Sequence, residues 1–260
     1  MLVLPDMKPN VLILGGTTEA RELAAALAGR PFVTTVSLAG RTVAPAEQGV
    51  PVRVGGFGGA AGLADYLLAN SVDFLIDATH PYAETISFNA AKAAAQTATA
   101  ILGLRRPLWQ AGDGDFWVDV AGPEGAVRAL GRTARRVFLA VGRQELNPFC
   151  NAPQHHYFIR SVDPVDPPLA VPNASYILAR GPFTEAGDHE LLQSNAINAI
   201  VAKNSGGTAT YSKIAAARVL GIPIFMFKRP PVPDYPAVAT VAEAVDWLHQ
   251  AAGLEVPRGV

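Results

Sequence analysis

Short apolar segments alternate with helix-like segments along this chain, and this alternation constrains the fold more than any other feature. Each apolar segment is rich in Val, Ile, Leu or Phe and ends in glycine or polar residues. Continuous apolar runs are typical of strands buried on both faces, and strands that alternate with helices indicate a parallel α/β sheet. In the first half, the expected strands are residues 11–16, 32–40, 51–59, 72–80 and 100–106, and the expected helices are residues 18–29, 60–70 and 84–99.

The alternation stops over residues 107–125, where Trp, Gly, Asp and Pro interrupt it, and then resumes. We therefore place a domain junction there and expect two domains of the same α/β character, residues 1–112 and 113–260. Proline-rich stretches at 163–172 and 228–236 are expected loops, because proline cannot donate to a sheet ladder. In the second half, the expected strands are residues 135–142, 155–160, 175–181, 196–204 and 222–230, and the expected helices are residues 185–195, 210–221 and 241–252.

Composition excludes several classes of protein. Of the 260 residues, 50% are hydrophobic and the formal net charge is -1, whereas nucleic-acid binding normally needs a strongly basic face. The single cysteine, Cys150, excludes an internal disulfide and a cysteine-based zinc cluster. No apolar run approaches the about 20 residues that cross a bilayer. We expect a cytoplasmic protein that binds neither nucleic acid nor membranes.

The segment "LILGGTTEAREL" places a strand, a tight turn and a helix start in the order that a dinucleotide site needs. The free N–H groups and partial positive charge of a helix N-terminus suit a phosphate. The usual pattern is glycine, any residue, glycine, any two residues, then glycine or alanine. Here Gly15 and Ala20 match, whereas Thr17 replaces the second glycine and offers a hydroxyl instead. The predicted cofactor-binding residues are Gly15, Gly16, Thr17, Thr18, Glu19, Ala20, Arg21, Arg41 and Thr79.

The end of the second expected strand favours NADPH over NADH. An NAD site usually has an acidic residue about 20 positions after the glycine turn, where it binds the ribose 2′-hydroxyl. The segment "VSLAGRT" has no acid there and has Arg41 near Ser37 and Thr42. A guanidinium matches the geometry of phosphate oxygens, so Arg41 is the predicted ligand of the 2′-phosphate.

Polar residues also follow the strand at 72–80, in "LIDATHPYAET". Ligands of open α/β sheets bind at the carboxyl ends of the strands, which makes Asp77, Thr79, His80 and Tyr82 candidate site residues. His80 and Tyr82 are candidate proton donors or could orient a ring. Asp77 and Thr79 could also simply cap the next helix.

Cationic and polar residues end several strands of the second half, in "GRQEL", "YFIRSV", "ARGPF" and "KNSGG". Parallel strands bring these ends to one edge of the sheet, where they would form a positive rim. A polyanionic ligand is therefore expected, with carboxylates or phosphates equally suitable. The predicted substrate-binding residues are Arg143, Gln144, Arg160, Arg180, Lys203, Asn204, Ser205, Gly206 and Gly207.

The combination of "GGTTEAR", "DATHPYA" and "KNSGG", with "GRQEL", "ARGPF" and "AAARVLGIPIFMFKRP", resembles the precorrin-6A reductase family of corrin-ring (cobalamin) biosynthesis. The resemblance implies two Rossmann-like domains with a cleft between them, with NADPH in the first domain and a tetrapyrrole substrate in the second. It implies hydride delivery to C19 and proton delivery to C18 of the macrocycle, giving precorrin-6B, without a metal or flavin. His80, Tyr82 and Lys203 are then the candidate catalytic residues, although we expect catalysis to be mostly positioning. Contact with neighbouring pathway enzymes is a further possibility.

Three alternatives stay open at this level. The related enzyme of the anaerobic pathway acts on the cobalt-containing macrocycle, and a non-catalytic nucleotide sensor could share the same fold. Short-chain reductases commonly use a Tyr and a Lys on one helix face. Tyr211 and Lys213 are spaced by two residues, which places them on different faces and disfavours that class.

Overall fold

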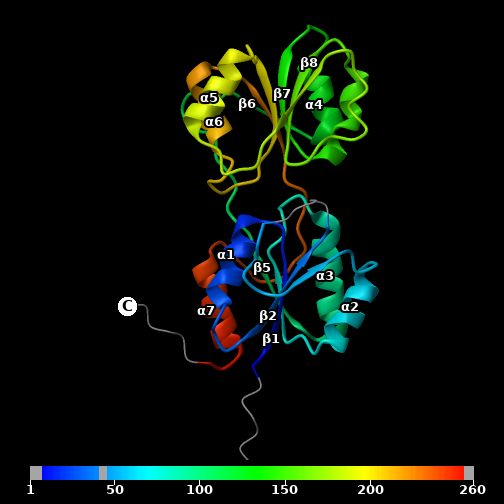
Figure 1. The fold of residues 1–260 in the computed structure, drawn as a ribbon, viewed down its shortest axis with the longest axis vertical. Coiled ribbons are helices and arrows are strands. Elements are labelled where there is room, and N and C mark those ends of the chain that lie inside the picture. Colours follow the sequence, from blue (N-terminus) through cyan, green and yellow to red (C-terminus); the bar gives the residue numbers. More distant parts are fainter. Residues whose placement is uncertain (1–7, 41–45, 255–260) are drawn as a thin grey trace, which may run out of the picture. The chain divides into compact units, whose positions relative to one another are not determined.

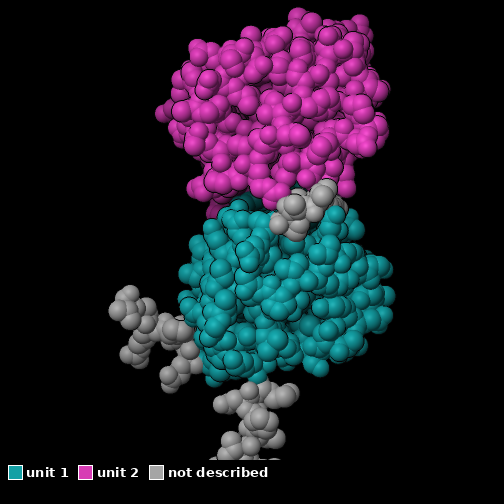
Figure 2. Space-filling model, viewed as in Figure 1, with its two compact units in different colours: residues 1–106, 230–260 teal, residues 107–229 magenta. Residues whose placement is uncertain are grey.

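The computed structural model describes residues 8–40 and 46–254, which form two compact units (Figure 2). Unit 1 comprises residues 1–106 and 230–260, and unit 2 comprises residues 107–229. Each unit is built around a six-stranded sheet in which every strand pair is parallel. The expected fold class, two α/β domains with parallel sheets, is therefore confirmed.

The sheet of unit 1 has the strand order β12-β5-β4-β1-β2-β3. Helices α1 (Thr18–Leu27) and α7 (Val241–Ala251) cover one face, and α2 (Ala60–Ala69) and α3 (Glu84–Thr97) cover the other (Figure 1). The strands are β1 (Asn10–Leu14), β2 (Val33–Leu38), β3 (Val52–Val54), β4 (Phe74–Asp77), β5 (Ala100–Leu104) and β12 (Ala237–Val238).

Strand β1 shows why these residues form a central strand. Val11 and Ile13 belong to the core beneath α1 and α7, whereas Leu12 and Leu14 belong to the core beneath α2 and α3. Successive side chains of a strand point to opposite faces, so a continuous apolar run is buried only when helices cover both faces of the sheet.

The sheet of unit 2 has the order β6-β11-β10-β7-β8-β9. Helices α5 (Glu185–Ser194) and α6 (Ser212–Leu220) lie on one face and α4 (Gly122–Leu130) lies on the other (Figure 1). Two 3₁₀ helices, η1 (Arg143–Glu145) and η2 (Asn147–Asn151), follow β7. The strands are β6 (Trp117–Val120), β7 (Arg136–Ala140), β8 (His156–Ser161), β9 (Ala174–Leu178), β10 (Ala199–Lys203) and β11 (Ile224–Phe227).

The unit boundaries differ from the expected domains because the chain returns to unit 1 at Pro230. Strand β12 pairs with β5, and Ala244, Val245 and Leu248 of α7 join the core that α1 covers. The sequence pattern identified the helix at 241–252 but gave no sign of which sheet it would cover. The interrupted stretch at residues 107–125 also contains β6 and the start of α4, where Gly122 and Pro123 resemble a loop in the sequence.

No helix within the described residues is long and apolar enough to cross a membrane.

Because the chain returns to unit 1, the stability of this unit depends on helix α7, whose side chains complete its core. Leu248→Ala should lower the free energy of unfolding by about 2–5 kcal/mol, because it leaves a cavity at a side chain that is 0% exposed. Hydrogen exchange should then speed up in β1 and α1, while β7 and β10 of unit 2 keep their protection. Val219→Ala on α6, at a side chain that is 75% exposed, is the control and should change stability by less than about 0.5 kcal/mol. Faster exchange in unit 2 alone would contradict this assignment.

Buried His155 makes unit 2 sensitive to acid. Its Nδ1 accepts a hydrogen bond from the Arg135 N–H, 3.2 Å away, and burial followed by the positive charge of Arg135 lowers the pKa of His155. A pKa below that of the unfolded chain, about 6.5, gives stability that is full above that pH and is lost as the pH falls. The melting temperature should therefore fall between pH 7 and pH 5. The fall should be shallower in His155→Asn, whose side-chain oxygen can still accept the Arg135 bond; an unchanged slope would contradict the role of His155.

Candidate functional site

The glycine turn after β1 has the geometry of an anion-binding turn. The Gly15 N–H donates to the Ser37 carbonyl of β2 at 2.9 Å, and a Cβ at Gly15 would lie 2.9 Å from Val36 Cγ1, so this close approach requires glycine. Gly16 has φ +111°, a conformation that side chains disfavour. The turn leads directly into the N-terminus of α1, where backbone N–H groups lack intrahelical partners. This arrangement fits a pyrophosphate.

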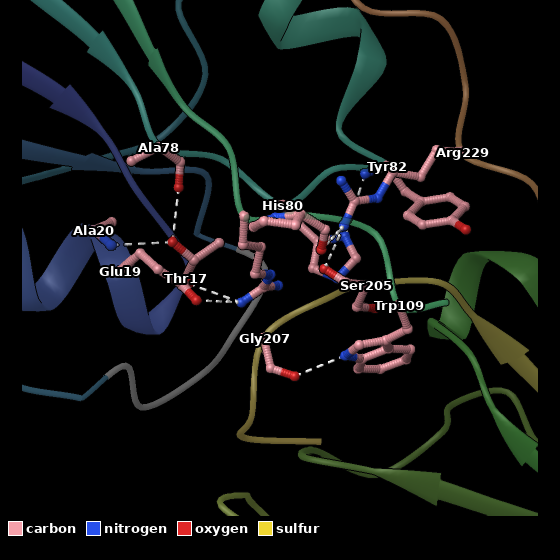
Figure 3. Close-up of polar contacts among 12 residues, drawn as sticks. Thr17, Glu19, Ala20, Ala78, His80, Tyr82, Trp109, Ser205, Gly207 and Arg229 are labelled. Carbon is pink, nitrogen blue, oxygen red and sulfur yellow. Dashed lines mark hydrogen bonds and ion pairs between the residues drawn. The ribbon is translucent and has the colours of Figure 1, made fainter. Parts of the chain in front are cut away.

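Thr17 explains the departure from the usual glycine pattern. Its Oγ1 accepts from the Ala20 N–H at 3.1 Å, which makes it the N-cap of α1, and donates to the Ala78 carbonyl at 2.8 Å (Figure 3). Because Ala78 directly follows β4, this hydroxyl ties the turn to the end of the neighbouring strand. Strand β4 pairs with one edge of β1 and strand β2 with the other, so the turn lies at the point where the strand order reverses.

Glu19 is paired within the protein. Arg106 donates to both carboxylate oxygens of Glu19, at 2.9 and 2.7 Å, and both side chains are largely buried. Glu19 is among the predicted cofactor ligands, whereas Arg106, which follows strand β5, is not. Of the other predicted cofactor residues, Thr18 is half-buried, Arg21 is exposed, and Arg41 lies outside the described residues.

A buried network organises the end of β4. Asp77, only 3% exposed, accepts from the N–H and hydroxyl of Thr79 at 3.1 and 2.6 Å. Its other oxygen accepts from the Tyr235 hydroxyl at 2.5 Å, and burial together with the Asp77 charge raises the pKa of Tyr235 well above its usual range. The phenol therefore stays protonated and acts as a donor. Sequence reasoning missed Tyr235 because it lies in the proline-rich stretch that was expected to be only a loop.

The two candidate proton donors lie in the turn that this network supports. The ring centroids of His80 and Tyr82 are 5.7 Å apart, and the backbone N–H of Tyr82 donates to His80 Nδ1 at 3.3 Å (Figure 3). Since Nδ1 accepts, a neutral His80 carries its proton on Nε2. Both side chains are half-buried.

In unit 2 the loop after β10 is held by Asn204, Trp109 and Arg229, of which only Asn204 is among the predicted site residues. The side-chain amide of Asn204, 9% exposed, accepts from the Trp109 N–H at 2.9 Å and donates to the Trp109 carbonyl at 3.0 Å. Trp109 Nε1 donates to the Gly207 carbonyl at 2.8 Å (Figure 3). Arg229 donates to the carbonyls of Asn204 and Ser205 at 2.8 and 3.0 Å. Asn204 therefore fixes the loop.

The strand order of unit 2 also reverses next to this loop, between β7 and β10. Lys203, the last residue of β10, forms an ion pair with Glu145 of η1, which follows β7. Gly206 and Gly207 both have positive φ, +67° and +69°, which only glycine adopts readily. The second glycine loop therefore also borders the point where the strand order reverses, but it follows β10, which corresponds to β4 of unit 1, whereas the first glycine turn follows β1, which corresponds to β7.

The four cationic residues lie at or just after the ends of adjacent strands, β10, β7, β8 and β9, but their environments differ. Arg160 is buried: it forms an ion pair with Asp188 at 2.5 Å, and its guanidinium lies 3.6 Å from the Phe183 ring centroid. Asp188 also accepts from Ser212 Oγ at 2.5 Å. Arg143 is exposed, with Asp163 3.7 Å away. Gln144 and Arg180 are exposed.

Within the described residues, no group of three or more His, Cys, Asp or Glu side chains is arranged to hold a metal ion.

The role of Asn204 in holding the second glycine loop can be tested by measuring the free energy of unfolding. Asn204→Ala removes the side-chain amide that hydrogen-bonds to both the N–H and the carbonyl of Trp109. It should lower the free energy of unfolding by about 1–3 kcal/mol, the cost of leaving buried polar groups unpaired. Asn173→Ala, at an exposed asparagine of the same unit, is the matched control. Denaturant unfolding followed by tryptophan fluorescence measures both variants. Equal stability of the two would show that Asn204 does not support the loop.

Known proteins match nearly the whole chain. A family model described as precorrin-6x reductase CbiJ/CobK matches residues 10–249. A precorrin-6A reductase of Sinorhizobium sp is 55% identical over 94% of this chain and 95% of its own, and one of Rhodobacter capsulatus is 49% identical over 96% and 99%. A cobalt-precorrin-6A reductase of Priestia megaterium is 29% identical over 90% and 96%.

A solved structure shows the same likeness. The structure of CobK precorrin-6A reductase superposes with a TM-score of 0.91 at 49% identity, covering 97% of this chain and all of its own. Fold and overall sequence both match those of these proteins, and the chain belongs to the precorrin-6x reductase family CbiJ/CobK.

Proposed function

We propose that this chain reduces precorrin-6A to precorrin-6B with NADPH, delivering hydride to C19 and a proton to C18 of the macrocycle. The observation that carries the proposal is the similarity to precorrin-6A reductases at 55% and 49% identity over at least nine-tenths of both chains. The cobalt-precorrin-6A reductase of Priestia megaterium is less similar, at 29% identity, which favours the metal-free macrocycle as substrate.

The residues of the first glycine turn fit a dinucleotide cofactor. Gly15 leaves room for a backbone approach that a Cβ would block, and Thr17 caps α1 so that its first N–H groups are presented in one orientation. These groups would bind the pyrophosphate of NADPH, which supplies the hydride when bound. Arg106 neutralises Glu19 beside them and so limits the repulsion between that carboxylate and a phosphate.

The strand ends of unit 2 would bind the carboxylates of the tetrapyrrole. Arg143 and Arg180 are exposed cations after β7 and β9, and arginine binds carboxylates in bidentate pairs. Arg160 differs, because its ion pair with Asp188 is buried. We assign it an indirect role: it holds the first turns of α5 and α6 through Asp188 and Ser212. Lys203, paired with Glu145, directly precedes the second glycine loop in the chain.

Proton delivery would involve the turn after β4. Neutral His80 carries its proton on Nε2, and Tyr82 lies beside it. We propose that catalysis depends mainly on holding cofactor and macrocycle in the reactive orientation with water excluded, and that neither side chain is an essential acid. The nitrogens of the conjugated macrocycle can take up charge that develops during reduction.

The activity is tested by following the NADPH absorbance band with precorrin-6A and, separately, with its cobalt form. The metal-free substrate should be reduced with the higher kcat/KM. If NADPH is not oxidised in the presence of either macrocycle, the proposed function is contradicted. A higher kcat/KM for the cobalt form would reverse the choice of substrate.

Variants of the turn after β4 test how the proton is supplied. Tyr82→Phe and His80→Asn should each retain kcat within about tenfold of the wild type, since a true general acid contributes about 10²–10⁴-fold. Arg180→Gln is the comparison and should raise KM more than it lowers kcat, because it removes a contact to a carboxylate remote from the reacting carbons. A loss of more than about 10²-fold in kcat for either ring variant, with substrate binding intact, would identify a catalytic acid.

A further inference from the structure

A fixed guanidinium lies at the carboxyl ends of β2 and β3. Arg53 of β3 is in register with Ser37 of β2, and its Nη1 donates to Ser37 Oγ at 3.3 Å. The same Nη1 donates to the Gly55 carbonyl at 2.5 Å, and Nη2 donates to the Gly56 carbonyl at 2.8 Å. These bonds tie the side chain to the loop that follows its own strand.

Two aromatic rings hold the flat face of this guanidinium. Its carbon lies 3.8 Å from the ring centroid of Phe57 and 5.2 Å from that of Tyr66 on α2. The rings themselves pack edge to face at 5.2 Å. Stacking and hydrogen bonding together restrict Arg53 to one orientation before any ligand binds, which lowers the entropy cost of using it in recognition.

The charge of Arg53 has no acidic neighbour in the described part of the chain. Arg106, at the end of β5 in the same sheet, is neutralised by Glu19, whereas the partners of Arg53 are a hydroxyl, two backbone carbonyls and two rings. A guanidinium has five N–H donors, and these three hydrogen bonds leave two of them for a ligand. A half-buried cation with remaining donors favours an anionic ligand group.

The position in the fold indicates which anionic group this is. In a dinucleotide-binding sheet, the ribose of the adenosine lies by the end of the second strand, and a nearby arginine accommodates a 2′-phosphate. We infer that Arg53 determines the specificity for NADPH by binding its 2′-phosphate, with Ser37 orienting the guanidinium. This inference rests on the proposed function. From the sequence, 2′-phosphate binding is predicted for Arg41 alone.

Binding measurements without turnover test the inference. Affinities of the wild type, Arg53→Gln and Arg53→Lys are measured for NADPH and NADH by fluorescence titration, and for 2′,5′-ADP and 5′-AMP by displacement. Arg53→Gln should weaken NADPH and 2′,5′-ADP by about 10- to 100-fold, the range expected for lost hydrogen bonds to a charged group. NADH and 5′-AMP should bind as before. Arg53→Lys should be intermediate, because lysine keeps the charge but not the planar fork.

Arg30→Gln is the matched control. It removes the same charge from unit 1, but Arg30 donates to the Ala26 carbonyl in the last turn of α1 and contacts His249. All four affinities should stay unchanged in this variant. A parallel loss of 2′,5′-ADP binding in Arg30→Gln would attribute the effect to net charge and overturn the inference.

The remaining outcomes separate this inference from the proposed cofactor. Equal affinity of the wild type for NADPH and NADH would overturn both. A wild-type preference for NADPH that persists in Arg53→Gln and disappears in Arg41→Gln would overturn the role of Arg53 and leave NADPH dependence intact. Equal losses for NADPH and NADH in Arg53→Gln would show that the residue only supports its loop, which also overturns the inference.

Discussion

The parallel pairing of β1 with both β2 and β4 is the constraint on which unit 1 depends. A strand whose side chains are buried on both faces must also pair its backbone groups on both edges, because unpaired N–H and C=O groups in the interior are costly. Strand β1 meets this condition only in the interior of the sheet. Its carboxyl end, with the glycine turn, is thereby fixed between the ends of two neighbouring strands, and Thr17 joins the turn to one of them.

In unit 2, too, a side-chain contact connects two neighbouring strands where the strand order reverses, but the side chains differ. The strand order reverses between β7 and β10, and the ion pair of Lys203 with Glu145 joins the segments that follow these strands. In unit 1 a neutral hydroxyl makes the corresponding connection to a carbonyl. A neutral connection leaves the positive end of α1 for a phosphate, whereas the corresponding connection in unit 2 is an ion pair between Lys203 and Glu145.

Several cations that look alike in the sequence have different partners in the fold. Arg160 and Arg106 form ion pairs with buried or half-buried carboxylates, Arg229 donates to backbone carbonyls, and Arg53 stacks on aromatic rings. A strand-end arginine is therefore weak evidence for a ligand until its neighbours are known. Burial contributes to the difference, because a fully buried charge must be paired within the protein.

The sequence by itself determined the alternation of strands and helices, the parallel sheets, the glycine turns and the residues at strand ends, because hydrophobic periodicity and glycine act locally along the chain. It did not reveal β6 and α4, whose local signals resemble a loop, or the return of α7 to the first sheet. Tertiary structure alone decided the partners of Tyr235, Asn204, Arg160 and Arg53. The physical reason is that these contacts join residues from different strands, helices and loops, and their energies depend on burial and distance, which no local pattern specifies.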